Sequence, residues 1–174
     1  MKWIVIPALS VTMGATGAIA LQNDLKERIK AEADLYELND LEHITTYTGS
    51  VIITQGSIRI EADTVTVKWA VNHETNERTI ESLTCNGQPA RFQQEINPEE
   101  GLVVATANTI FYDHSNEKIE LTKDANITRE DGSLLTSDSI LYDLSTGGMS
   151  AGKNERVKTV FPPQKQKEEK DGDS

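Results

Sequence analysis

Residues 47–69 read YTGSVIITQGSIRIEADTVTVKW, and the fold of the 174-residue chain can be worked out from this stretch. Its apolar residues recur at every second position, which is the period of a strand with one buried face. Glycines and an aspartate separate the apolar segments, which predicts a β-hairpin followed by a third short strand. We expect Gln55 and Gly56 to form the hairpin turn, because glycine readily takes the positive φ of two-residue turns. The alternating residues are Val51, Ile53, Ile58, Ile60, Val65 and Val67.

A short pattern centred on an aspartate or asparagine repeats along the chain. It is clear at residues 60–65, 105–110 and 135–140, and weaker at 30–36. An Asp or Asn side chain can bond a nearby backbone N–H and shape a corner, while the small residue beside it lets strands approach closely. Repeated corners predict stacked units of a few strands that share one core. The corner residues are Asp34, Asp63, Asn108 and Asp138.

Further short segments of alternating or apolar character continue to residue 161, and turn residues separate them. No segment after residue 35 has a sustained helical period. The sequence therefore predicts an all-β protein of roughly a dozen or more short antiparallel strands. The additional strands are expected at 79–84, 90–94, 102–106, 109–113, 118–121, 126–129, 139–143 and 156–161, and turns at 72–76, 86–87, 97–98, 114–116, 131–132 and 146–148.

The two ends of the sequence differ from its middle. Residues 1–20 have a positive start, an apolar stretch and the small-x-small end Ala18-Ile19-Ala20, which predicts a secretory signal peptide cleaved before Leu21. An uncleaved membrane anchor is the alternative for this segment. Residues 162–174 contain no aliphatic or aromatic residue, and we expect them to form a disordered tail. The folded domain is thus predicted over residues 21–161.

Charge and cysteine content exclude several function classes. The formal net charge is −11, which argues against a nucleic-acid partner because such binding needs a concentrated basic surface. Cys85 is the single cysteine, so no disulfide can form within the chain, and we expect it to be a small buried hydrophobe. Stability must therefore come from packing of the sheet.

No enzyme or metal motif stands out. The three histidines, at positions 43, 73 and 114, lack the spacing of metal ligands, and neither a serine elbow nor a phosphate-binding loop is present. The remaining feature is the apolar face of the strands. That face is either an ordinary packed core or one wall of a groove suited to acyl chains, and the pattern leaves both open.

Two neighbouring blocks carry a family resemblance. Residues 48–56 (TGSVIITQG) and 58–63 (IRIEAD) resemble the OstA-like (LptA) family of periplasmic lipopolysaccharide-transport proteins. The TG-x-V-x-x-T-Q-G block with its Ala-Asp corner is fairly specific, and the likeness covers most of residues 28–163 in the same order. It continues through residues 87–92, 118–122, 138–142 and 156–160.

The resemblance implies a folded-open β-jelly roll that carries lipopolysaccharide across the periplasm with the acyl chains between its sheets. It also implies head-to-tail assembly, in which an edge strand of one protomer extends the sheet of the next. Such an assembly would link an inner-membrane partner, LptC, to an outer-membrane partner, LptD. The lipid-contacting positions of the family correspond to Ile29 near the N-terminal opening and Phe92 after the Gly-x-Pro-Ala turn.

We therefore expect a non-enzymatic lipid carrier that needs no cofactor or metal. Because lipid A and this chain are both anionic, acyl burial at roughly 25 cal/mol per Å² should supply most of the affinity. Lys26, Arg28 and Lys30 are candidates for local contact with lipid phosphates. The competing hypotheses are a stacking scaffold without lipid cargo and a sugar-cleaving enzyme. Strand alternation predicts that the path is lined by Val51, Ile53, Ile58, Ile60, Val65, Val67, Phe92, Ile110 and Ile127.

Overall fold

The computed structural model describes residues 24, 26–72, 74–75, 77–96, 101–143, 146, 148–152 and 155–163. Within these ranges ten strands form one antiparallel sheet. The predicted leader, and the predicted tail from residue 164 onward, lie outside the described residues. The strands are β1 (Lys30–Glu32), β2 (Leu35–Asn39), β3 (Ile44–Gln55), β4 (Ile58–Val71), β5 (Arg78–Glu95), β6 (Leu102–Asp113), β7 (Lys118–Arg129), β8 (Leu134–Asp143), β9 (Met149–Ala151) and β10 (Lys158–Val160).

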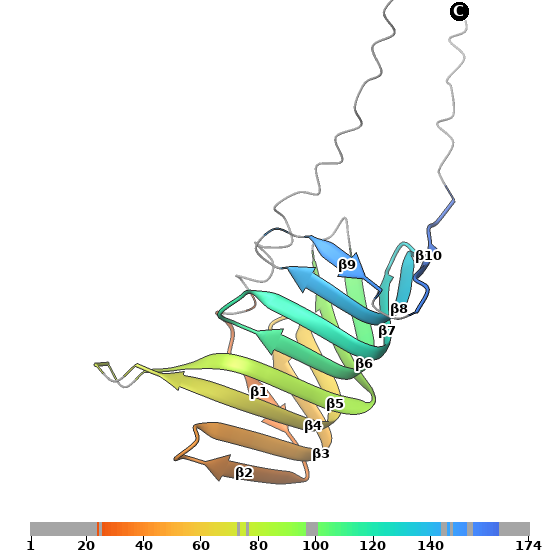
Figure 1. The fold of residues 1–174 in the computed structure, drawn as a ribbon. Helices are drawn as coiled ribbons and strands as arrows, with labels where there is room; N and C mark the ends of the chain where they lie inside the picture. The colour runs from red at the N-terminus through yellow and green to blue at the C-terminus, as the bar shows by residue number, and fades with distance from the viewer. Residues whose placement is uncertain are drawn as a thin grey trace, which may run out of the picture.

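The strands stack in chain order from one end of the molecule to the other (Figure 1). β3 to β8 form the continuous centre, and each pairs with the next along the chain. Both outermost layers are split into two short strands. β1 and β2 both pair with β3, at opposite ends of its length, and β9 and β10 do the same with β8. Among the residues that the structure describes, the stack therefore has two unpaired edges at each end.

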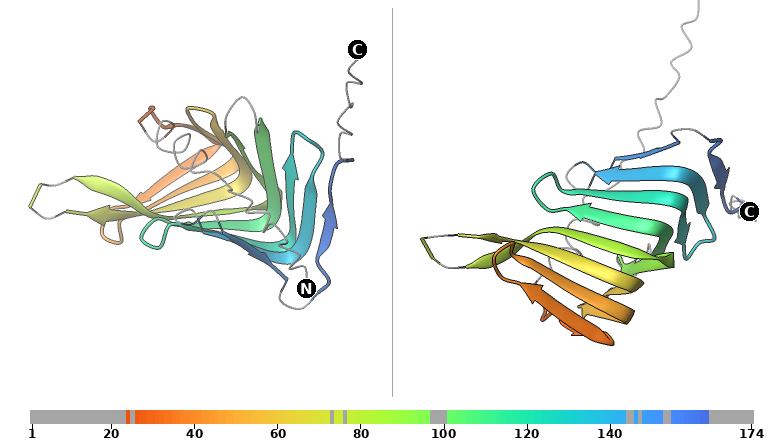
Figure 2. Two further views of the ribbon diagram at one scale, coloured as in Figure 1. Left: turned by 90° about the horizontal axis from the view of Figure 1, so that it is seen from above. Right: turned by 60° about the horizontal axis from the view of Figure 1, so that its bottom comes forward.

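Each central strand bends sharply, and the bends follow one line across the sheet that we call the crease (Figures 1 and 2). At the crease the register between neighbouring strands is interrupted. In the three pairs β3–β4, β5–β6 and β7–β8, two or three residues of the first strand lie opposite one residue of the second, as in a β-bulge. The bulged residues are 49–50, 87–89 and 123–124, and the single residues opposite them are Asp63, Asn108 and Asp138.

The predicted corners are therefore confirmed as the points where β4, β6 and β8 cross the crease. Asp34 extends the same line, since it separates β1 from β2 and its N–H donates to the Gly49 carbonyl at 3.0 Å. The small residue that precedes each corner is buried at the inside of the bend. Ala62, Ala107 and Ser137 occupy these positions. Larger side chains would hold the two arms of the sheet apart at this line.

The crease divides the sheet into two halves. The β1 half contains β1, β10 and the neighbouring parts of the central strands, and the β2 half contains β2, β9 and the remaining parts. The two halves face each other, and the apolar side of each points inward. We call this combined surface the inner face. A single hydrophobic cluster of buried residues forms its base.

Two details of the sequence prediction are corrected. Ten strands are present in the described residues rather than a dozen or more, because most of the predicted short strands join across the crease into long ones. Asn86 and Gly87 accordingly lie inside β5 rather than in a turn between strands. In the first hairpin Gln55 pairs with Ile58, so the turn consists of Gly56 and Ser57, with Gly56 at a φ of +59°. The all-β, folded-open architecture itself is confirmed.

Candidate functional site

The inner face consists of rows of side chains that run from one end of the stack to the other. Each row is traced by residues that pair directly on successive strands. In the β1 half the middle row is Ala31, Ile53, Ile60, Phe92, Ala105, Ile127, Leu135 and Thr159. In the β2 half two rows are Tyr36, Tyr47, Val65, Cys85, Ile110, Leu121, Ile140 and Ala151, and Leu38, Thr45, Val67, Leu83, Tyr112, Ile119, Tyr142 and Met149.

On β6 and β7, burial decreases with distance from the crease. On β6, Ala107 is fully buried, Ala105 is 7 % exposed and Val103 is only partly buried. β7 shows the same trend from buried Leu121 to partly buried Ile119. On these two strands the side chains are packed at the crease and become more accessible toward the margin, whereas Thr45 and Gln94 are buried at the margins of β3 and β5. We call the inner face between its two margins the groove: its base is the buried cluster at the crease, and its wall is mostly apolar.

The groove wall carries little charge. The pKa of the buried Cys85 thiol is raised to about 12 by desolvation, so the thiol stays protonated at neutral pH. Desolvation is also the main cause of the raised pKa values of Tyr47 and Tyr112, with smaller contributions from Tyr36 and from Glu117 and Asp113 respectively. Neutral, desolvated side chains suit an apolar ligand better than an ionic one.

The margin of the β1 half is more polar than the rest of the inner face. We call the outermost inward-facing residues of this half the mouth row: Ile29, Gln55, Ile58, Gln94, Val103 and Arg129. Gln94 pairs with Val103, which in turn pairs with Arg129. Arg129 is the single charged side chain among the rows named here, and Gln94 is almost completely buried. An amphiphile in the groove would meet hydrogen-bond donors at this margin.

All ten residues predicted to contact lipid lie on the inner face or at its margin, but at different depths. Val51, Val65 and Ile110 are buried at its base, while Phe92 is partly buried and Ile29 is 47 % exposed at the mouth row. Sequence reasoning missed Leu83, Leu121 and Ile140, which complete the same rows. It also missed the polar mouth residues, because Gln94 and Arg129 interrupt an apolar alternation and belong to no motif.

Exposed apolar side chains gather at the two ends of the stack. Near β2 they are Leu35, Tyr36, Leu38 and Leu41, and at the β9–β10 end they are Met149, Val157, Val160 and Phe161. The rows of the inner face end at these edges. Each end therefore combines unpaired strand edges with apolar surface, which is the combination expected where another strand is added.

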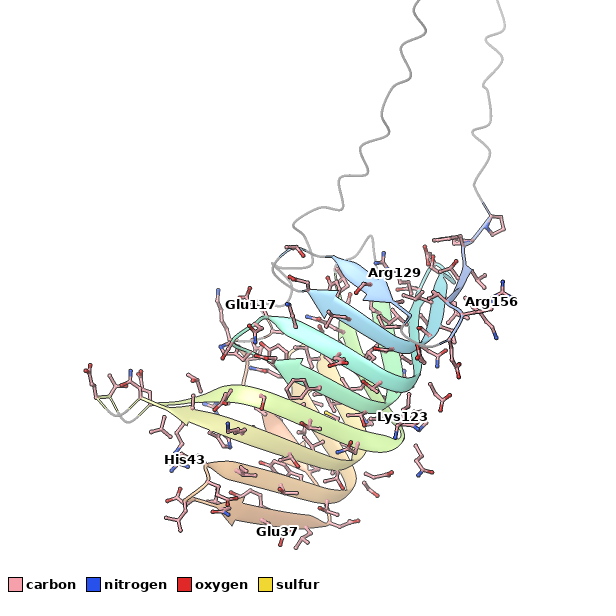
Figure 3. The ribbon with its side chains drawn as sticks, in the orientation of Figure 1. Glu37, His43, Glu117, Lys123, Arg129 and Arg156 are labelled. Atoms are coloured by element: carbon pink, nitrogen blue, oxygen red, sulfur yellow. The ribbon has the colours of Figure 1, made fainter. Side chains whose placement is uncertain are left out.

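Charged side chains of both signs lie at each end of the stack. At one end, Lys30 and Glu32 are on β1, and Asp34 and Glu37 lie beside or on β2. At the other end, Glu155 and Arg156 precede β10, and Lys158 begins it. Glu37 and Arg156 mark the opposite ends of the stack in Figure 3.

Potential metal ligands do not cluster in the part of the chain that the structure describes. No group of three His, Cys, Asp or Glu side chains within it could hold a metal ion. His114 instead shares a 2.9 Å hydrogen bond with Tyr112, and His73 lies outside the described residues. In the same ranges, no helix has both the length and the apolar character to span a membrane.

A second hollow, of about 880 Å³, lies on the outer side of the crease and is polar. It is lined by acidic and basic side chains together, among them Lys123, Asp124 and Arg156. Lys123 and Arg156 are labelled in Figure 3. Its mixed charge distinguishes it from the apolar groove on the inner face.

Comparison with known proteins agrees with this geometry. A family described as "LptA/(LptD N-terminal domain) LPS transport protein" matches residues 30–148. The chain belongs to this family. The matched region extends from β1 to the residue before β9, and so contains the whole crease. The family resemblance inferred from residues 48–63 is thereby confirmed.

Individual members of the family align over nearly the whole chain. The lipopolysaccharide export system protein LptH of Pseudomonas aeruginosa is 30 % identical over 166 residues, covering 90 % of this chain and 91 % of that protein. LptA of Escherichia coli K12 is 31 % identical over 161 residues, covering 90 % and 82 %. The crystal structure of LptH, titled the periplasmic component of the lipopolysaccharide transport device, superposes with a TM-score of 0.70 at 28 % identity and covers 80 % of this chain and 99 % of that one.

Proposed function

We propose that this protein carries lipopolysaccharide through the periplasm, with the acyl chains lying along the inner face. The observation that carries the proposal is the set of rows, apolar except for Thr45 and Thr159, that continue from the β1–β2 edges to the β9–β10 edges. Membership of the LPS transport family supports the same function, as do the names of the relatives. Because the wall is apolar, acyl burial supplies the affinity for a ligand whose charge has the same sign as the protein.

Lipid contact is proposed mainly for residues on the accessible part of the wall. Ile29 and Phe92 line or approach the margin of the β1 half, where an acyl chain can enter without separating the two halves, and Ile127 is buried in the same row as Phe92. The buried residues Val51, Ile53, Ile60, Val65, Val67 and Ile110 form the floor beneath it, and Ile58 is buried in the mouth row. Opening of the two halves about the crease would bring these residues into contact with a thicker ligand.

Transport by this protein involves no reaction. We infer that the chain moves lipid between apolar surfaces and makes or breaks no covalent bond. Apart from Arg129 in the mouth row, the inward-facing groups named above are aliphatic, aromatic or neutral polar side chains, and the thiol of Cys85 is buried and protonated. This inference agrees with the description of the family as transport proteins.

We further propose that copies join head to tail and that the resulting chain connects LptC at the inner membrane with LptD at the outer membrane. The two split edges at each end of the stack allow strand addition in both halves at once. Export through a signal peptide over residues 1–20 would deliver the protein to the periplasm.

Site-specific crosslinking tests the proposal directly. A photoreactive amino acid at position 92 should crosslink to lipopolysaccharide in cells, whereas one at position 111, on the outer side of β6, should not. A scaffold without lipid cargo predicts crosslinks to protein only at both positions. Equal lipid crosslinking from 92 and 111 would indicate nonspecific adsorption and would contradict a path along the inner face.

A further inference from the structure

Asp24 is buried at the mouth of the groove, where three donors hold its carboxylate. The backbone N–H of Ser57 donates to Oδ1 at 2.8 Å, and the Ser57 hydroxyl donates to Oδ2 at 2.8 Å. The Gln94 side-chain amide also donates to Oδ2, again at 2.8 Å. Asp24 is 8 % exposed and Gln94 is 6 % exposed. We call this arrangement the Asp24 clasp.

The backbone of the first hairpin is shaped to admit this carboxylate. Gly56 has a φ of +59°, and a Cβ atom built there would collide with Asp24 Oδ1. Any other residue at position 56 would therefore fill the place that an oxygen of the carboxylate occupies. Ser57 is also held in place, because its hydroxyl accepts from the Glu95 N–H at 3.2 Å. The donors are thus positioned by the sheet rather than by Asp24.

The clasp fastens the segment that precedes β1 across the mouth row. Residues 24 and 27 are linked by a turn, in which the Glu27 N–H donates to the Asp24 carbonyl at 2.9 Å. Gln55 of the mouth row donates to the Glu27 carbonyl at 3.1 Å. The side chains of Lys26 and Arg28 are exposed beside these contacts. The segment therefore places one carboxylate inside the site, and two basic side chains together with the carboxylate of Glu27 on its outside.

The three donors suit an oxyanion in general and not only a carboxylate. Backbone amides, hydroxyls and side-chain amides bind phosphate and carboxylate oxygens alike. The site also opens directly above the apolar rows, since Gln94 is two residues from Phe92 on the same face of β5. An oxyanion bound there would leave an attached acyl chain lying on the accessible wall.

We propose that the Asp24 clasp is a head-group site for an anionic lipid, and that the chain's own carboxylate occupies it until the lipid displaces it. This inference rests on the proposed lipid-carrier function and adds a gate at its mouth. A phosphate group of the lipid replaces Asp24 at Ser57 and Gln94, and the released segment brings Lys26 and Arg28 to the same phosphate. Removal of Asp24 without a replacement leaves the buried amide of Gln94 unpaired, which favours entry of another acceptor.

Titration with two soluble amphiphiles tests the inference. Dodecyl phosphate and the neutral dodecyl maltoside are titrated below their critical micelle concentrations into the full mature chain by calorimetry. Asp24→Ala should bind dodecyl phosphate about tenfold more tightly than wild type, because no internal ligand has to be displaced. Its affinity for dodecyl maltoside should change less than twofold. Asp24→Asn should also bind dodecyl phosphate more tightly than wild type. Adding Gln94→Leu to Asp24→Ala should abolish the gain in affinity for dodecyl phosphate.

Asp131→Ala is the matched control. Asp131 also accepts from the N–H and hydroxyl of one serine, Ser133, at 2.7 and 3.0 Å, but it is exposed in the β7–β8 turn and its two bonds are local. This variant should bind both amphiphiles as wild type does. Thermal unfolding of each variant checks that the sheet is retained.

The outcomes separate the two proposals. If dodecyl maltoside binds but Asp24→Ala gives no selective gain for dodecyl phosphate, the head-group site is overturned and the carrier function stands. If Asp24→Ala binds both amphiphiles more tightly by the same factor, the segment only covers the apolar wall, and the oxyanion site is overturned. If inorganic phosphate alone binds Asp24→Ala as tightly as dodecyl phosphate, the site takes free anions and not a lipid head group. If neither amphiphile binds any variant, the carrier function itself fails.

Discussion

Ile60 on β4 and Phe92 on β5 lie directly opposite each other, and both belong to the inner face. Ile60 is buried, whereas Phe92 is only partly buried and presents part of its ring to the groove. The pair therefore marks the boundary between the packed floor and the accessible wall. This boundary is where a substitution should affect lipid binding more than stability.

Phe92→Asp should weaken lipopolysaccharide binding at least tenfold in a pull-down titration. The substitution removes an aromatic ring and places a charge on a desolvated wall next to acyl chains, and each change costs on the order of 1–3 kcal/mol. Phe111→Asp is the control, because Phe111 lies on the outer side of β6. Comparable losses in both variants would show that general destabilisation, and not the wall, accounts for the effect.

Ala107→Val should lower the free energy of unfolding by about 1–3 kcal/mol, because two added methyl groups have no space inside the bend. Ala107 is 0 % exposed and pairs with Ala90, which is also completely buried. Ala70→Val, at an exposed position of β4, should be close to neutral. Urea unfolding of the three proteins measures the difference, and an unchanged midpoint for Ala107→Val would mean that the crease is not tightly packed.

Stability should fall with rising pH through the titration range of Cys85. The ordinary pKa of a cysteine thiol is 9.0, and burial raises the pKa of Cys85 to about 12 in the folded chain. Between these values the unfolded chain loses the thiol proton and the folded chain keeps it, so the free energy of unfolding decreases as pH rises above about 9. Cys85→Ala should lack this component of the decline when melting temperatures are compared from pH 8 to pH 11.

The same burial protects Cys85 from alkylation. At pH 8 the folded chain should react with iodoacetamide roughly a hundredfold or more slowly than the urea-unfolded chain, since the thiolate is the reactive form. Equal rates in the two states would contradict both the burial and the raised pKa. Mass spectrometry of timed samples provides the measurement.

Strand alternation and Asx corners were sufficient to predict the inner face. Period-two alternation determines which face of the sheet a side chain lies on, and it correctly put Val65 and Ile110 on the inner face. Asp63, Asn108 and Asp138 lie at the crease, and each follows a small residue that fits inside the bend. The joining of strands across the crease was not predictable. The Asn86-Gly87 pair is typical of a turn, but in the structure β5 continues through Gly87 because it pairs with β4 and β6 both before and after this residue.

The Asp24 clasp illustrates what pattern reading omits. Asp24 and Gln94 are 70 positions apart, and nothing in either neighbourhood marks them as partners. Gln94 could have been noticed as a polar residue on the same face of β5 as Ala90 and Phe92. Its hydrogen-bond acceptor, Asp24, comes close to it only because the segment before β1 crosses the tip of the first hairpin. Contacts of this kind depend on tertiary arrangement and have no local signal.

The split outer layers have a mechanical consequence. The central strands cross the crease unbroken, but the chain presents separate edges, β1 and β2 at one end and β9 and β10 at the other. Any joint between copies would comprise two short ladders set at an angle, and neither ladder could slip by one residue without disturbing the other. Such a joint would resist twisting as well as separation. It would keep the apolar walls of successive copies aligned, so that a lipid could pass from one copy to the next without rotating.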